Sequence, residues 1–196
     1  IRFNSAPTLA DIQALDPYAI IVATGGSAIK PPIEGVDQPH VCTVTEILDG
    51  SIKLTRERVT VIGSGMTGLE TAEKLCEDGN RVLVVEMMEQ IGPGAHSQHL
   101  DDVLPRLKNY HTEFISRHKL VKITTSGIIL EDTKTGQRME HAVDHVVLSV
   151  GVRSNDKLAK ELRPHFVRLY TIGDARKIGR IAHATRDGFD VAWNLQ

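Results

Sequence analysis

The chain has 196 residues, of which 41% are hydrophobic and 24% charged, a composition typical of a packed domain and not of a disordered segment. Its formal net charge of −2 argues against nucleic-acid binding, and no apolar run is long enough to span a membrane. Its two cysteines, Cys42 and Cys76, exclude a disulfide scaffold or a cysteine-built metal site within this chain, and they fit a cytoplasmic protein.

The first firm element is an apolar run at residues 18–23, which ends at Thr24-Gly25-Gly26. Such a run predicts a strand buried on both faces. Residues 30–35 contain two prolines and predict a connection. The chain opens on Ile1 with neither a start methionine nor a signal peptide, so we expect an internal segment of a longer protein.

Residues 58–86 predict a strand, a glycine-rich turn, a helix and a second strand. The strands are the apolar runs at 58–62 and 81–86, and Gly79-Asn80 is typical of a left-handed helix end. This is the order and size of a βαβ unit. One face of the predicted helix is apolar and consists of Leu69, Ala72, Leu75 and Cys76.

Apolar residues at helical spacing predict a second helix at about 99–108, which Pro105 should kink unless it falls in the first turn of a later start. Alternating apolar residues between about 119 and 139 predict an antiparallel meander. Another buried strand is expected at 145–150.

A strand at 166–172, ended by Gly173-Asp174, precedes a helix that runs from Ile181 to Leu195. Strands and helices alternate along most of the chain. The fold class predicted is therefore α/β, with a doubly wound, Rossmann-like domain that also contains an antiparallel meander.

The turn after residue 62 matches the dinucleotide fingerprint GxGxxG. Gly63 permits a tight turn, Gly65 lets a pyrophosphate approach the backbone, and Gly68 lets the helix pack closely on the strand. The alternative is that these glycines only form a turn. The predicted pyrophosphate-binding residues are Gly63, Ser64, Gly65, Met66, Thr67 and Gly68.

Glu86 ends the second strand of this unit, where a carboxylate can accept hydrogen bonds from the adenosine ribose hydroxyls. A 2′-phosphate would meet like charge there. No Lys or Arg follows until Arg106, so we expect NADH to be favoured over NADPH. Met87 is included in the predicted site, and the alternative interpretation is that Glu86 is a solvated strand end.

Three further segments, Ala23-Thr24-Gly25-Gly26, residues 149–155 and residues 169–175, complete a pattern. Together with the fingerprint, they resemble the two-dinucleotide-binding flavoproteins of the pyridine nucleotide-disulfide oxidoreductase type. That resemblance implies an NAD(P)H-binding domain at 54–151, flanked by parts of an FAD-binding domain at 1–53 and 152–196.

The resemblance also implies roles for individual residues. Val150 and Gly151 would border the nicotinamide. Glu70 would lie on the nicotinamide side, although a simple first-turn acid is an equal alternative. The residues implied to hold FAD are Ala23, Thr24, Gly25, Gly173 and Asp174.

Within this superfamily the chain looks most like the C-terminal half of NADH:flavin oxidoreductases with an old-yellow-enzyme barrel, such as 2,4-dienoyl-CoA reductase and enoate reductase. It lacks the first FAD fingerprint and the CxxxxC pair of disulfide reductases. We therefore expect a fragment, inactive in isolation, with the barrel, FMN and an iron–sulfur cluster upstream of Ile1.

The resemblance implies that hydride passes from NADH to FAD and that electrons continue to the upstream barrel of the same polypeptide. No catalytic acid–base residue is predicted, because such transfer depends on placement. The alternative function is a non-catalytic module that binds ADP. His96 with His99, and His141 with His145, are interpreted as ordinary polar residues and not metal ligands, while the role of Arg153 stays open.

Overall fold

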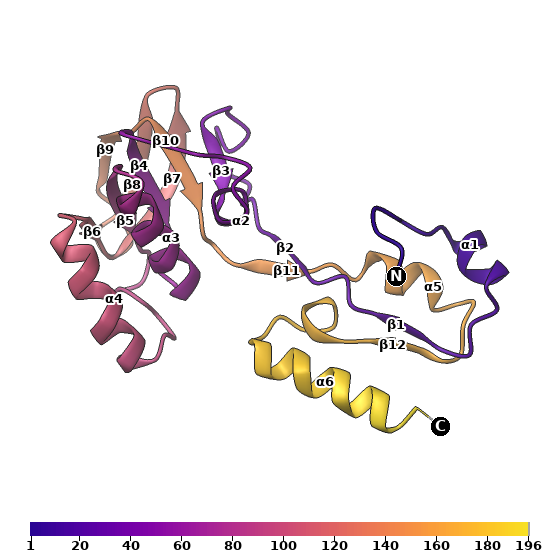
Figure 1. Ribbon diagram of the computed structural model, residues 1–196. Helices are drawn as coiled ribbons and strands as arrows, with labels where there is room; N and C mark the ends of the chain where they lie inside the picture. The colour runs from indigo at the N-terminus through magenta and orange to yellow at the C-terminus, as the bar shows by residue number, and fades with distance from the viewer. Residues whose placement is uncertain (196) are drawn as a thin grey trace. The chain divides into compact units, whose positions relative to one another are not determined.

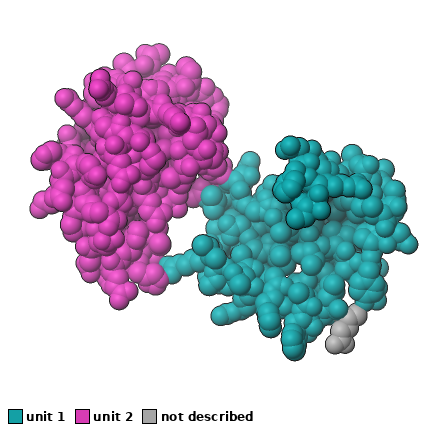
Figure 2. Space-filling view, viewed as in Figure 1, with its two compact units in different colours: residues 1–27, 152–196 teal, residues 28–151 magenta. Residues whose placement is uncertain are grey.

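The computed structural model describes residues 1–195 and is drawn in Figure 1. The chain forms two compact units, coloured separately in Figure 2. The larger unit is Ala28–Gly151, and the smaller one combines Ile1–Ser27 with Val152–Gln196. Among the described residues, no helix has the length and apolar character needed to cross a membrane.

The larger unit is built on a parallel sheet whose five strands are all paired in parallel. The chain enters at one edge of the sheet, continues at the middle strand, moves outward to the other edge and returns to the position between the first strand and the middle one. This is the doubly wound, Rossmann-like α/β fold that the sequence predicts. The strand order is β3 (Val41–Thr43), β10 (His145–Leu148), β4 (Arg58–Ile62), β5 (Arg81–Val85) and β6 (Glu113–Ile115).

Helices cover one face of this sheet: α2 (Val44–Leu48), α3 (Met66–Glu77) and α4 (Ser97–Asn109) (Figure 1). Leu69 and Leu75 of α3 and Leu107 of α4 are buried against Val61 and Val84 of the strands. Burial of such side chains stabilises the fold by roughly 1.5–3 kcal/mol each. The sheet and its helices therefore share one apolar core.

The predicted meander covers the opposite face. It consists of β7 (His118–Thr124), β8 (Gly127–Asp132) and β9 (Arg138–Ala142), paired antiparallel. Its Ile123, Ile128 and Leu130 pack with Val85 and Leu148 of the sheet in a second core. The meander therefore forms the third layer of the larger unit.

Helix α3 ends as the sequence predicts. Gly79 has a φ of +84°, its N–H donates to the carbonyl of Cys76, and the N–H of Asn80 donates to the carbonyl of Leu75. These two bonds satisfy carbonyls that the helix end would leave free. The Asn80 side chain also donates to the carbonyls of Leu54 and Leu75, both at 2.8 Å, and so fixes the start of β5.

Helix α4 differs from its prediction. It begins at Ser97, before the predicted start at 99, and Pro105 lies inside it and not in its first turn. Pro105 cannot donate a backbone hydrogen bond. Val103 and Leu107 are both fully buried, and the Arg106 guanidinium pairs with Glu73 of α3, so tertiary packing holds the helix through this residue.

The smaller unit contains a two-stranded parallel sheet of β1 (Ile20–Val22) and β12 (Leu169–Thr171). A short pair joins β2 (Gly26–Ala28), whose first two residues belong to this unit, to β11 (Val152–Ser154). Its other elements are the helices α1 (Leu9–Ala14), α5 (Lys157–Leu162) and α6 (Ile181–Trp193), with a 3₁₀ turn at Gly173–Ala175.

Three sequence predictions for this unit need correction. The strand at 18–23 shortens to Ile20–Val22 and is not buried on both faces, because Ile21 is 46% exposed while Val22 is buried. The strand at 166–172 shortens to Leu169–Thr171. Helix α6 ends at Trp193 and has no buried residue. With only two strands in this sheet, few side chains are available to cover either face.

The boundary between the units also lies earlier than the expected domain boundary. Strand β3 pairs with β10, so residues 28–53 belong to the larger unit and not to the first flanking part. The cofactor assigned to each unit stays a prediction.

Candidate functional site

A cleft of about 510 Å³ opens at the carboxyl ends of β4, β5 and β10. The direction in which strands are added to the sheet reverses at β4. Its neighbours β5 and β10 both come later in the chain and lie on opposite sides of it. Ligands of open α/β sheets bind at such switch points. Six predicted site residues line the cleft: Gly63, Gly65, Glu86, Met87, Val150 and Gly151.

The three glycines of the turn have different surroundings. Gly63 has a φ of +100°, and a Cβ there would lie 2.3 Å from the carbonyl oxygen of Ser149. A Cβ on Gly68 would lie 2.1 Å from the carbonyl oxygen of Gly63, so the helix approaches the turn closely. A Cβ on Gly65 would meet nothing within 4 Å. The open space at Gly65 fits a bound pyrophosphate.

Helix α3 begins at Met66, directly after this open position. Its first internal hydrogen bond runs from the N–H of Leu69 to the carbonyl of Gly65, at 3.0 Å. The N–H groups of Met66, Thr67 and Gly68 therefore have no partner within the helix. Together with the helix dipole, they favour an anion at the cleft.

Glu86 is directed toward the glycine turn and is only 4% exposed. Its Oε2 accepts hydrogen bonds from the backbone N–H and the hydroxyl of Ser64, at 2.9 and 2.7 Å. Its Oε1 accepts one from the backbone N–H of Met88 at 2.9 Å. A carboxylate offers about four acceptor positions, so Oε1 has room for one more donor.

Ser64 joins the turn to the segment after β5. Its side chain is fully buried, and its hydroxyl accepts a hydrogen bond from the N–H of Gly92 at 2.9 Å while donating to Glu86. Ser64 therefore does not line the cleft. It acts on the site by holding the Glu86 carboxylate and the segment around Gly92 in place.

Several cleft residues are not among those the sequence predicts. Pro31 and Ile33 come from the connection before β3, while His118, Lys119 and Leu120 come from the meander. No motif marks these residues, because the fold alone brings the meander to this edge. Lys119 is a candidate partner for a phosphate, although its Nζ lies 2.7 Å from Glu131 Oε1, a carboxylate that also pairs with Arg138 at 2.9 Å.

Glu70 does not line this cleft. Its Oε1 lies 4.0 Å from Nε2 of His99 on α4, and that nitrogen is buried without a hydrogen-bond partner among the described groups. Glu70 therefore lies beside α4 and not beside the cleft. Across residues 1–195, no group of three or more His, Cys, Asp or Glu side chains could hold a metal ion, which covers His96 and His99 as well.

The residues that the resemblance assigns to FAD lie in the smaller unit. Strands β1 and β12 run in parallel, so their carboxyl ends bring Thr24 and Gly25 to the same edge as Gly173 and Asp174. The Thr24 hydroxyl donates to the carbonyl of Asn155 at 2.5 Å. Both glycines of this set have a left-handed backbone conformation, with φ of +71° at Gly25 and +57° at Gly173.

Asp174 also supports its own loop, because its Oδ1 accepts a hydrogen bond from the N–H of Gly179 at 3.0 Å. The N–H of Gly173 donates to Asp187 Oδ2 of α6 at 3.0 Å, and Asp187 pairs with Arg176 at 2.9 Å. Ala23, which precedes this cluster, is exposed, as is Arg153 of β11. These contacts fix the turn but leave the cofactor assignment a prediction.

The two cysteines are buried thiols. Burial raises the pKa of Cys42 to about 11 and also raises the pKa of Cys76. A thiol with a raised pKa is a poor nucleophile at neutral pH. Neither residue has the character of a redox or catalytic cysteine.

The family described as pyridine nucleotide-disulphide oxidoreductase matches residues 8–166, which is most of the chain and includes the whole larger unit. The chain belongs to this family. Membership implies an oxidoreductase that uses FAD and NAD(P)H, and the parallel sheet with its glycine turn is the corresponding fold.

The chain is 33% identical to a bilirubin reductase of Mediterraneibacter gnavus over 91% of its residues, and 30% identical to an NADH oxidase of Thermoanaerobacter brockii over 94%. It also resembles the structure of a 2-naphthoyl-CoA reductase, with a TM-score of 0.90, 26% identity and 97% of this chain covered. The chain spans only 28% and 29% of the two relatives and 29% of the solved chain.

Proposed function

We propose that the larger unit binds NADH in the cleft at the end of β4, as part of an NADH-dependent flavin oxidoreductase. The observation that carries this proposal is the open space at Gly65, directly before the N-terminus of α3. The pyrophosphate lies against the N–H groups of Met66 and Thr67, and Gly63 and Gly68 hold the turn that exposes them.

Glu86 gives the site its preference for NADH. Its remaining acceptor position on Oε1 takes one adenosine ribose hydroxyl. The 2′-phosphate of NADPH would instead bring a second negative charge to a nearly buried carboxylate. Lys119, which also lines the cleft, is directed toward Glu131, a carboxylate that it shares with Arg138.

The nicotinamide end of NADH lies toward Val150 and Gly151, which follow β10 and line the same cleft. FAD would be held in part by Thr24, Gly25, Gly173 and Asp174, where it would supply the acceptor for the hydride of bound NADH. A barrel domain of the same polypeptide, with FMN and an iron–sulfur cluster, would supply the onward electron acceptors. No residue of this chain needs to exchange a proton in that transfer.

Calorimetric titration of the 196-residue chain with NADH and with NADPH tests the binding step. NADH should bind more tightly, and the chain alone should bind it without turnover. Tighter binding of NADPH would overturn the role given to Glu86.

The second candidate is a structural module that binds ADP in the same cleft and transfers no electrons. The glycine turn and the N-terminus of α3 favour it equally, because both recognise the pyrophosphate. Addition of NADH to the full-length protein distinguishes the two. Loss of the oxidised flavin absorbance supports the oxidoreductase, and an unchanged spectrum with flavin bound supports the ADP module.

A further inference from the structure

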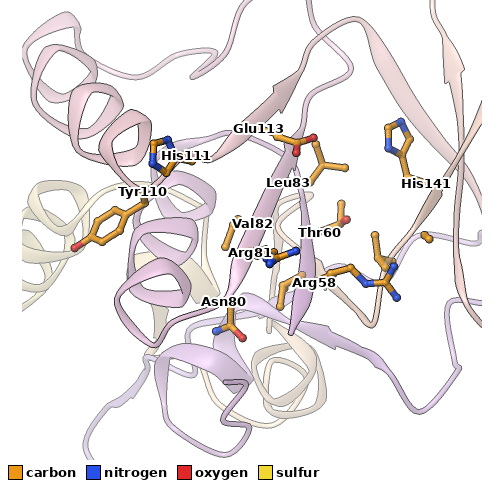
Figure 3. A pocket seen from close by; sticks show the side chains of 13 residues that line it. Arg58, Thr60, Asn80, Arg81, Val82, Leu83, Tyr110, His111, Glu113 and His141 are labelled. Atoms are coloured by element: carbon orange, nitrogen blue, oxygen red, sulfur yellow. The ribbon is translucent and has the colours of Figure 1, made fainter. Parts of the chain in front are cut away.

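A second cavity of about 470 Å³ lies at the opposite end of the same sheet, near the amino ends of β4 and β5 (Figure 3). Its walls come from these two strands, from the segment after α4 and from the last residues of the meander. A neighbouring cavity of about 420 Å³ shares Arg58 and Arg81 with it. Neither cavity shares a lining residue with the cleft at the carboxyl ends of β4, β5 and β10, called the dinucleotide cleft below.

Two arginines lie side by side at this end of the sheet. Arg58 of β4 and Arg81 of β5 are register partners on adjacent parallel strands, so their side chains leave the same face. Like charges in neighbouring positions of a sheet are destabilising. Asp144 pairs with Arg58 at 2.6 Å, whereas Arg81 forms no ion pair with any described residue.

Two hydrogen-bonding side chains in the walls also have no partner. Thr60 is fully buried, and its hydroxyl has no hydrogen bond to a described group, nor has Nε2 of His141. Figure 3 shows Thr60 beside Arg81 on the strands. It shows His141 on a separate wall, which the meander forms. A buried polar atom without a partner costs free energy. Both atoms therefore favour a ligand that offers hydrogen bonds.

We propose that this cavity binds a small oxyanion that carries a neighbouring hydroxyl group, such as a hydroxycarboxylate or a phosphate ester of an alcohol. Arg81 binds the carboxylate or phosphate through its planar guanidinium. The hydroxyl group of the ligand bonds with Thr60 and His141, and Leu83 and Val143 form the apolar part of the wall. The site is independent of the dinucleotide cleft and of the function proposed for it.

Titration of the 196-residue chain, followed by NMR of its backbone amides and histidine rings, tests this proposal. The probes are lactate, glycerol 3-phosphate and acetate, the last being a carboxylate without a hydroxyl. Signals of Thr60 and His141 should shift saturably, and lactate should bind more tightly than acetate. Whether lactate or glycerol 3-phosphate binds more tightly identifies the oxyanion as carboxylate or phosphate.

Three variants sharpen the result. Arg81→Gln should weaken binding of both hydroxylated probes by about tenfold or more, the loss expected for a charge-assisted hydrogen bond. Thr60→Val keeps the shape of the side chain and should make lactate bind no better than acetate. Arg163→Gln removes an exposed arginine of the smaller unit and should change neither affinity.

Three outcomes would overturn the proposal. Shifts confined to the amides of residues 63–68 would mean that only the glycine turn binds anions. An equal loss in the Arg81 and Arg163 variants would mean a non-specific charge effect. Absence of a saturable shift at Thr60 and His141 would mean that the cavity holds water alone.

Discussion

Substitution of Gly68 and Gly65 by alanine should separate the packing of the glycine turn from its role in binding. A Cβ at Gly68 would lie 2.1 Å from the carbonyl oxygen of Gly63, whereas carbon–oxygen contacts are normally no shorter than about 3.3 Å. The turn would have to move by about 1 Å. Gly63 cannot yield easily, because the carbonyl of Ser149 lies against it.

The magnitude follows from these contacts. Overpacking of this kind costs up to about 3 kcal/mol, and the higher helix propensity of alanine returns about 1 kcal/mol. We therefore expect Gly68→Ala to lower the free energy of unfolding by about 2 kcal/mol. Gly65 has an ordinary φ of −58° and open space at its Cβ position, so Gly65→Ala should cost under about 1 kcal/mol.

Gly65→Ala should have a large effect on NADH binding, in contrast to its small effect on stability. A methyl group there occupies the space left for the pyrophosphate, so Gly65→Ala should weaken NADH binding by at least about tenfold. Urea unfolding followed by circular dichroism measures stability, and calorimetry measures affinity. A Gly65→Ala variant that binds NADH normally would refute the placement of the pyrophosphate, and a fully stable Gly68→Ala variant would refute the packing argument.

Three further outcomes are expected. Glu86→Gln should raise the affinity for NADPH relative to NADH by about tenfold, since it removes the like charge, while the exposed Glu89→Gln should leave the ratio unchanged in the same calorimetric titrations. Arg58 lowers the pKa of Asp144 from 3.8 to about 2, so this pair stabilises the folded chain above about pH 4 and ceases to do so as the pH falls toward 2. In urea unfolding between pH 2 and 5, the free energy of unfolding should fall less steeply with decreasing pH for Asp144→Asn than for the unmodified chain. Identical slopes would contradict the pairing. Cys42 and Cys76 should not react with a thiol reagent such as dithionitrobenzoate at pH 8 until the chain is unfolded, and rapid labelling of the folded chain would contradict their burial.

The larger unit was predictable because its signals are local. The apolar strands at 58–62 and 81–86, the glycine turn and the cap at Gly79 each specify backbone geometry without distant contacts. The course of α4 through Pro105 was not predictable in this way. It depends on the burial of Val103 and Leu107 against α3 and the sheet, which no local pattern shows.

The candidate site divides along the same line. Gly63, Gly65 and Glu86 could be found in sequence because strand ends and a fixed spacing mark them. The wall formed by His118, Lys119 and Leu120 arises only when the meander folds over the sheet.

The structure also changes what Glu86 does. The sequence suggests a carboxylate free to bind both ribose hydroxyls, but three of its acceptor positions already bind Ser64 and Met88. Its charge is therefore fixed beside the turn before any ligand arrives. A preorganised charge of this kind discriminates by excluding a 2′-phosphate more than by attracting a ribose, because the repulsion needs no further hydrogen bond. In the proposed NADH site, we therefore expect specificity to depend on Ser64, which the fingerprint leaves unspecified, as well as on the glycines that define it.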